Sequence, residues 1–191
     1  RDRNVTGVQT CALPIYPHIT TLDPETLLAS KTITNGEGFC IPKALLLAAV
    51  GRAVGIPSRV GFSDVRNHLS SEQLLQKMGT DLFVFHGYTE LWLDGQWVKA
   101  TPAFNVALCE RFGVAPLEFD GTRDSLFHPF DSDGRKHMEY VYDHGTYADL
   151  PYTEFLTQFS AAYPHFFDAT DDSQSKDTFQ SATTHQPTTK I

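Results

Sequence analysis

The sequence has no run of about 18 apolar residues, so nothing in it predicts a membrane-spanning helix. Basic residues are also few, since 15 Lys and Arg stand against 23 Asp and Glu and give a net charge of −8. This balance disfavours nucleic acid and an anionic membrane surface as partners. The three cysteines, Cys11, Cys40 and Cys109, form an odd set without metal-ligand spacing. Free thiols in a reducing, cytoplasmic compartment are therefore expected rather than a disulfide framework.

The two ends of the chain differ in composition from its middle. Residues 1–15, RDRNVTGVQTCALPI, resemble translated sequencing-adapter sequence joined to bacterial metagenomic gene fragments, which implies a non-native leader and excludes Cys11 from the chemistry. From residue 168 onward the chain is rich in Ser, Thr, Asp and Gln, so a disordered tail is expected over 168–191. Residues 16–167 are long and apolar enough to form one compact domain.

The stretch GEGFCIPKALLLAAVGRAVGIPSRV, residues 36–60, places a cysteine directly before an apolar helix. Pro42 suits the first turn and Gly55 followed by Pro57 ends the helix, so a buried helix is predicted over 42–54. Cys40 therefore lies at a helix N-terminus, where partial positive charge favours the thiolate and free N–H groups can receive an oxyanion. Position alone leaves two interpretations open, an activated nucleophile or a small buried hydrophobic side chain.

Residues 82–101 predict a β-hairpin with Asp94-Gly95 as its two-residue turn. Alternation along LFVFHGYTELWL places His86 and Tyr88 on the same face of the strand. His86 is a candidate general base, although a histidine in an aromatic strand is also typical of simple packing. Further strands are predicted at 58–65 and 138–143, with helices at 70–79 and 149–163. This order predicts an α+β fold in which a buried helix packs on an antiparallel sheet.

The blocks GEGFCIPKALLLAAVGRAVGIPSRV and HGYTELWLDGQWVKATPAFN together resemble the transglutaminase-like family of the papain-like thiol enzymes. The resemblance covers roughly residues 23–105. It lies in a Gly-x-Cys that opens a helix, in a His followed at two-residue steps by an aromatic residue and a Glu, and in a G-x-W before a proline. It implies a papain-like α+β core in which Cys40 is the nucleophile and His86 the general base and acid. The family usually has an aspartate before Pro102, whereas this chain has Thr101.

That aspartate orients the imidazole and stabilises its protonated form. If Leu93 pairs with Gln96 across the turn, Thr101 is the diagonal neighbour of His86 on the same face, roughly 7 to 8 Å away. A Thr hydroxyl can accept the imidazole N–H but carries no charge, which makes Thr101 the candidate third residue of the site. Asn105 is the rival orienting group.

The resemblance implies a thiol-dependent acyl-transfer enzyme acting on the amide or ester bonds of a protein, peptide or small amide. Hydrolysis is slightly favoured over transamidation because water needs no dedicated acceptor site, and neither a metal nor an organic cofactor is implied. The alternative is a catalytically weakened or inactive binding or scaffold module of the same fold, which Thr101 suggests and the presence of both Cys40 and His86 opposes.

The segment 118–150 is rich in aromatic and charged residues and has no clear helical period. We expect it to pack over or beside Cys40 with Phe127 and Tyr142, the alternative being an ordinary surface excursion. The spacing of His128, His137 and His144 matches no strong metal pattern, so no metal site is expected there.

Overall fold

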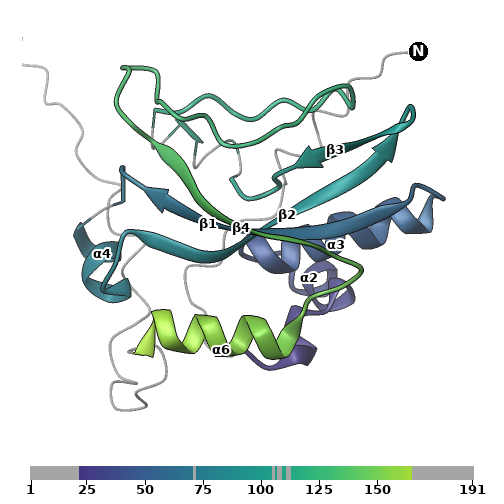
Figure 1. Ribbon diagram of the computed structural model, residues 1–191, viewed down its shortest axis with the longest axis horizontal. Coiled ribbons are helices and arrows are strands. Elements are labelled where there is room, and N and C mark those ends of the chain that lie inside the picture. Colours follow the sequence, from purple (N-terminus) through teal and green to yellow (C-terminus); the bar gives the residue numbers. More distant parts are fainter. Residues whose placement is uncertain (1–21, 71, 105, 107–108, 111–112, 165–191) are drawn as a thin grey trace, which may run out of the picture.

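The computed structural model describes residues 22–164, except 71, 105, 107–108 and 111–112. The expected leader and tail, with the boundaries assigned to them, lie outside these residues. The described chain forms a four-stranded antiparallel sheet with helices packed against one of its faces (Figure 1). The predicted α+β fold is confirmed. None of the helices in this part of the chain has the length and apolar character needed to cross a membrane.

The described part of the chain begins and ends with helices, and the four strands lie between them, with one short helix between the first two strands. The short 3₁₀ helix η1 and helices α2 and α3 come first, and β1, α4, β2 and β3 follow. A long connection then leads to β4 and α6. Their bounds are η1 Pro24–Leu27, α2 Ala29–Asn35, α3 Cys40–Ala53, β1 Ser58–Asn67, α4 Glu72–Met78, β2 Leu82–Leu93, β3 Gln96–Ala100, β4 Met138–Tyr147 and α6 Tyr152–Ala162. The strand order is β3-β2-β1-β4, so β2 is a central strand next to β1 and β3.

Helix α3 begins at Cys40, two residues before the predicted start, because the extended Phe39 already serves as its N-cap. Its two charged side chains are both satisfied. Lys43 is buried and donates through Nζ to the carbonyl of Ala103 at 3.0 Å, while Arg52 donates to the carbonyl of Ser58. Because both of its charged side chains are hydrogen-bonded, most of α3 can be buried against the sheet.

The β2–β3 hairpin has the predicted turn and register. Asp94 and Gly95 both have positive φ angles, 48° and 87°, as a two-residue hairpin turn with the twist of its strands requires. Leu93 pairs with Gln96, and the pairing continues to the end of β3. The side chains that follow His86 on alternate positions consequently lie on one face of β2, and those between them lie on the other.

A β-bulge that the sequence pattern does not reveal interrupts β2 directly before His86. Val65 pairs with Phe83 and Ser63 pairs with His86, so two residues of β2, Val84 and Phe85, stand opposite Asp64 alone. Phe85 has a φ of 58°. A non-glycine residue in this left-handed region carries backbone strain on the order of 1–3 kcal/mol, which the surrounding structure must offset.

The apolar core is divided into separate clusters. The largest cluster fills the space between the sheet and helices α3 and α6, and includes Ile41, Phe62, Phe85, Phe155 and Tyr163. A separate cluster consists of Val65, Ala103, Phe127 and Met138. Cys40 packs against both clusters, so the first turn of α3 lies where the two meet.

The segment 118–150 is partly regular, because β4 occupies residues 138–147 and pairs with β1. In the remaining part, Phe127 lies where it was expected, because it is buried in the cluster against which Cys40 packs. Tyr142, in contrast, is 60% exposed on β4 and stacks against His144, so nothing indicates that it covers Cys40.

Strand β2 approaches the backbone of α3 closely at Gly87. A Cβ atom placed there would lie 3.1 Å from the Cα of Ile41, 3.3 Å from the carbonyl oxygen of Cys40 and 3.4 Å from the Cβ of Ala44. Two of these neighbours belong to the backbone of α3 and cannot rotate away. Strand β2 can therefore reach the first turn of α3 only because position 87 has no side chain.

Gly87→Ala is expected to destabilise the protein by about 1–3 kcal/mol, because the added methyl overpacks the contact between β2 and α3. The free energy of unfolding should be measured by urea denaturation. A surface substitution on α4, Gln76→Ala, is the control and should leave that free energy within about 0.5 kcal/mol of the wild-type value. A Gly87→Ala protein as stable as the control would contradict this packing.

Candidate active site

Cys40 is the first residue of α3, and the N-terminal N–H groups of this helix have no side-chain cap. The residue is partly buried. Gly38 allows the chain to enter the helix closely, since a Cβ there would lie 3.2 Å from Thr32 and 3.3 Å from Pro42. The thiol interacts with the backbone N–H groups of Gly87 and Ile41. These donors are of the kind that can stabilise a thiolate or the oxyanion formed when a thiol attacks a carbonyl.

His86 directly precedes Gly87 and so lies beside the first turn of α3. Only 6% of His86 is exposed. Its ring packs edge-on against Phe127, with the ring centroids 4.9 Å apart. Phe127 belongs to the same cluster against which Cys40 packs. The structure therefore brings the two residues predicted as nucleophile and base to the same junction of helix and sheet.

Burial determines the protonation state of both groups. Burial of the thiol raises the pKa of Cys40, against the opposing effects of the Gly87 and Ile41 N–H groups and of Lys43. Burial also lowers the pKa of His86 to about 4, against a smaller opposite effect of its own backbone. The prediction that the helix N-terminus keeps Cys40 as a thiolate is therefore wrong for the resting protein. Desolvation outweighs the effect of the helix end, and both the thiol and the imidazole favour their neutral forms.

Thr101 follows the end of β3 and is 1% exposed. Its hydroxyl lies near that of Tyr140, where it lowers the pKa of Tyr140 against the larger raising effect of burial, but the geometry is too poor for a proper hydrogen bond. Among the described residues, neither the Oγ1 of Thr101 nor the Nδ1 of His86 has a hydrogen-bond partner. The expected His86–Thr101 hydrogen bond is thus absent from this part of the chain. Asn105, the rival, lies outside the described residues.

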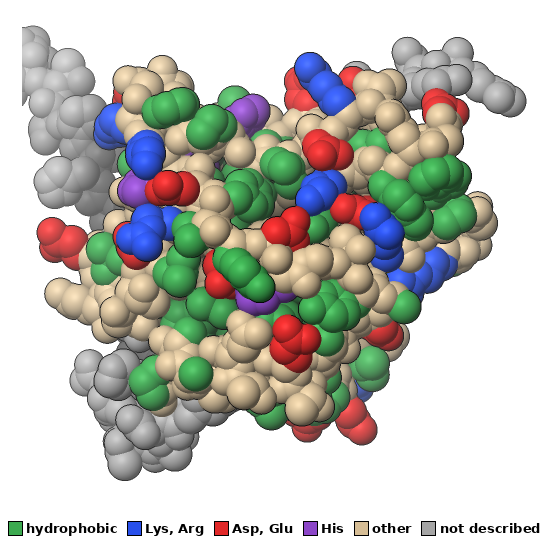
Figure 2. Space-filling view, in the orientation of Figure 1, with side chains coloured by type: hydrophobic (Ala, Val, Ile, Leu, Met, Phe, Trp, Pro, Cys, Tyr) green, Lys and Arg blue, Asp and Glu red, His purple; other side chains and the backbone are tan. Residues whose placement is uncertain are grey.

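The nearest acidic residue along β2 does not replace the missing aspartate. Glu90 is 5% exposed and forms an ion pair with Arg59 from β1, while Lys99 of β3 lies 3.9 Å from it. Lys99 also donates to the hydroxyl of Tyr88 at 3.2 Å. Figure 2 shows acidic and basic side chains interspersed over the face of the molecule that it displays. The charge of Glu90 is therefore already balanced by cations of neighbouring strands.

Three residues near His86 were not identified from the sequence as parts of the site. Asp64 accepts a hydrogen bond from the N–H of Phe85 and another from His144. The hydroxyl of Tyr163 accepts a hydrogen bond from the N–H of Val84, the residue before Phe85. No sequence signal marks them, because a bulge has no residue signature and its partners come from distant strands and from the end of α6. His144 was considered only as a metal ligand, and no group of three or more His, Cys, Asp or Glu suited to a metal occurs among the described residues.

A cysteine that opens a helix, packed on an antiparallel sheet beside a strand histidine, defines an α+β fold with a candidate thiol site. Residues 15–102, a little under half of the chain, match the family model of the transglutaminase-like superfamily, the family that the motifs resemble. The matched stretch contains Cys40, His86 and Thr101. No curated protein matches the chain.

The lowered pKa of His86 predicts a pH-dependent stability. The unfolded histidine takes up its proton near pH 6.5, whereas the folded one does so only near pH 4. The unfolded state therefore binds more protons between these values, and up to about 3 kcal/mol of stability is lost as the pH falls from 6.5 to 4. Urea titrations across this range should show a shallower loss for His86→Gln than for the wild type. Equal pH slopes would contradict the burial of a neutral His86.

The raised pKa of Cys40 predicts slow alkylation at neutral pH. The rate of reaction with iodoacetamide, followed at Cys40 by mass spectrometry, should rise about tenfold per pH unit up to and beyond pH 9, because only the thiolate reacts. A Cys109→Ala protein provides a background in which Cys40 is the only thiol among the described residues. A rate that is already maximal at pH 6 would mean that the thiolate is the resting form.

Proposed function

We propose that the protein is a thiol-dependent acyl-transfer enzyme that cleaves amide or ester bonds through an acyl-cysteine intermediate. The observation that supports this best is the close approach of Gly87, the neighbour of His86, to the first turn of α3, where a Cβ on Gly87 would lie 3.3 Å from the carbonyl oxygen of Cys40. It offers a nucleophile, a base and an oxyanion donor within a few residues of one another. The proposed substrate is a protein, a peptide or a small amide.

The chemistry begins from a neutral pair. The sulfur of Cys40 attacks the carbonyl carbon while the imidazole of His86 takes the thiol proton, so charge separates only as the bond forms. The N–H groups at the start of α3 and of Gly87 stabilise the oxyanion. His86 then gives its proton to the leaving amine or alcohol, and a thioester remains on Cys40. Water, or an amine, attacks this thioester and gives its own proton to His86. The C–S bond then breaks, the acyl group leaves as an acid or an amide, and His86 returns the proton to the sulfur of Cys40.

Hydrolysis is our preferred outcome of the second step, because water needs no acceptor site. The loss of charge at position 101 affects both steps. An imidazolium formed at His86 has no carboxylate beside it among the described residues, and its Nδ1 donates to nothing there. We therefore expect slow turnover in comparison with an enzyme that has a complete Cys-His-Asp set.

A binding or scaffold module is the second candidate function. The absence of a carboxylate beside His86 among the described residues favours it. If charge separation cannot be stabilised, the fold remains and the reaction does not occur. Turnover that depends on Cys40 separates the two functions, because a scaffold needs a folded site and no reactive sulfur.

Hydrolysis of an activated ester should be measured for the wild type, Cys40→Ala, His86→Ala and Cys109→Ala. The first two substitutions should lower kcat by at least about 10³-fold, because each removes a reacting group. Cys109→Ala is the matched control, since it removes the other free thiol of the described residues, which is buried, and it should retain full activity. Wild-type turnover no faster than that of Cys40→Ala would exclude the enzyme and favour the scaffold.

Thr101→Asp should raise the pKa of His86 and increase kcat by about tenfold or more, because a carboxylate would stabilise the imidazolium. Thr101→Ala should lower kcat by no more than about threefold, since Thr101 offers no charge. Asn105→Ala belongs in the same series. A silent Thr101→Ala together with a severely impaired Asn105→Ala would assign the orienting role to Asn105 instead.

A further inference from the structure

The bulge before His86 determines on which face of β2 the imidazole lies. A bulge adds one residue to a strand and reverses the alternation of side chains beyond it. His86 is the first residue after the bulge that pairs again with β1. Its Nδ1 has no hydrogen-bond partner among the described residues, and its ring packs edge-on against Phe127, so packing and the preceding backbone contribute to its orientation. The contacts that stabilise the bulge therefore help to determine the orientation of the His86 ring.

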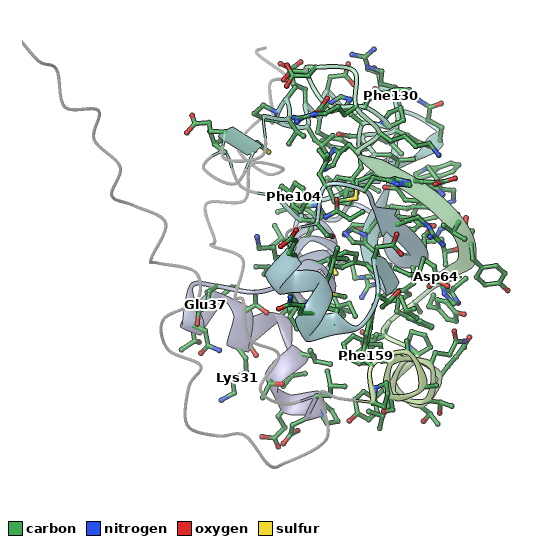
Figure 3. The ribbon with its side chains drawn as sticks, turned by 90° about the vertical axis from the view of Figure 1, so that its left-hand side faces the viewer. Lys31, Glu37, Asp64, Phe104, Phe130 and Phe159 are labelled. Carbon is green, nitrogen blue, oxygen red and sulfur yellow. The ribbon has the colours of Figure 1, made fainter. Side chains whose placement is uncertain are left out.

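The carboxylate of Asp64 holds one side of the bulge. Its Oδ1 accepts a hydrogen bond of 3.0 Å from the N–H of Phe85, the residue with positive φ. The same oxygen lies 2.7 Å from the Nε2 of His144 on β4. Because a carboxylate only accepts hydrogen bonds, this ring nitrogen must carry the hydrogen. Figure 3 shows Asp64 on the sheet, near the helix that carries Phe159.

His144 supports the bulge in two ways. Its side chain is only 3% exposed, and it fixes the carboxylate of Asp64, which is 15% exposed. Its ring also stacks on that of Phe85, with 4.2 Å between the centroids. The backbone N–H and the side chain of the strained residue are thus held by the same pair of residues.

Tyr163 holds the other side of the bulge. Its hydroxyl accepts a hydrogen bond of 2.6 Å from the N–H of Val84 and donates one of 2.7 Å to the carbonyl of Leu82. Both N–H groups of the bulge are therefore satisfied by side chains from outside β2. One comes from β1 and the other from the residue that follows α6.

We infer that Asp64, His144 and Tyr163 form a clamp, here called the bulge clamp, that positions His86 for the reaction of Cys40. These are positioning residues, because they act through the backbone of Val84 and Phe85. The inference rests on the proposed function for its effect on turnover. Its effect on the orientation of His86 does not depend on any activity.

The test combines two measurements on Asp64→Ala, Asp64→Asn, His144→Phe and Tyr163→Phe. The ring signals of His86, assigned by comparison with His86→Gln, are followed by NMR in protein labelled at histidine. They are sensitive to orientation because the ring of Phe127 lies 4.9 Å away. The kinetic constants for the activated ester are measured in parallel, and circular dichroism checks the fold.

Asp64→Ala should shift the His86 signals and lower kcat about tenfold or more with KM within about twofold, since small misplacements of a reacting group are costly. Asp64→Asn keeps an acceptor oxygen for Phe85 and should restore kcat to within about threefold of the wild type. His144→Phe keeps the stacked ring without its N–H donor and should lie between the two. Tyr163→Phe should shift the same signals of His86.

Two matched controls separate the bulge clamp from general packing. Asp81→Ala removes another carboxylate that joins β1 to the start of β2, through Arg66. Tyr152→Phe removes another α6 phenol hydroxyl, which donates to the carbonyl of Leu22 at 2.8 Å. Both controls should leave the His86 signals and kcat unchanged.

The outcomes are distinguishable from a failure of the proposed function. If the wild type has no Cys40-dependent turnover but Asp64→Ala and Tyr163→Phe move the His86 signals, the enzyme is excluded and the bulge clamp stands. If folded Asp64→Ala leaves the signals and kcat unchanged, or if Asp64→Asn is as impaired as Asp64→Ala, the inference is overturned. Should Asp64→Ala fail to fold, Tyr163→Phe decides, and unchanged His86 signals in it overturn the clamp.

Discussion

The contact between Gly87 and the first turn of α3 is the constraint on which the site depends. A strand and a helix can approach this closely only where one of them lacks a side chain, and the backbone of Ile41 lies 3.1 Å from the position that a Cβ would occupy. The contact places the N–H of Gly87 at the Cys40 thiol and holds His86 beside it. Two apolar clusters also meet here, since Cys40 packs against both.

The same close packing explains the electrostatics of the pair. Water is largely excluded from the thiol and the imidazole, so each favours its neutral form: the pKa of Cys40 rises and that of His86 falls to about 4. In a site with a carboxylate at position 101, the gain from an ion pair would oppose this desolvation. Thr101 supplies no such gain, and Glu90 is already paired with Arg59. The packing around Cys40 and His86 therefore keeps both groups uncharged.

The features that depend on residues close together in the sequence could be predicted from it. The Asp94-Gly95 turn determines the register of the hairpin, and the apolar helix with its glycine and proline end places Cys40 at a helix start. Family motifs supplied Cys40 and His86 as candidate site residues, which stay a prediction. What could not be predicted depends on contacts between distant segments. The bulge at Phe85 is stabilised by Asp64, His144 and Tyr163, which are separated from it by up to 79 residues. The protonation states likewise follow from burial, which no local motif encodes.

The two hydrogen bonds at the bulge have a consequence for the order in which the site takes shape. Cys40, His86 and Thr101 all lie within the first 101 residues, yet the partners of Asp64 and Val84 come from β4 and from Tyr163. During synthesis the N-terminal segments leave the ribosome first. A nascent chain therefore exposes its cysteine and histidine before the last strand and the final phenol exist to fix the backbone between them. The backbone before His86 takes its final form only when residue 163 has been added, so the nascent chain cannot complete the candidate site before that point.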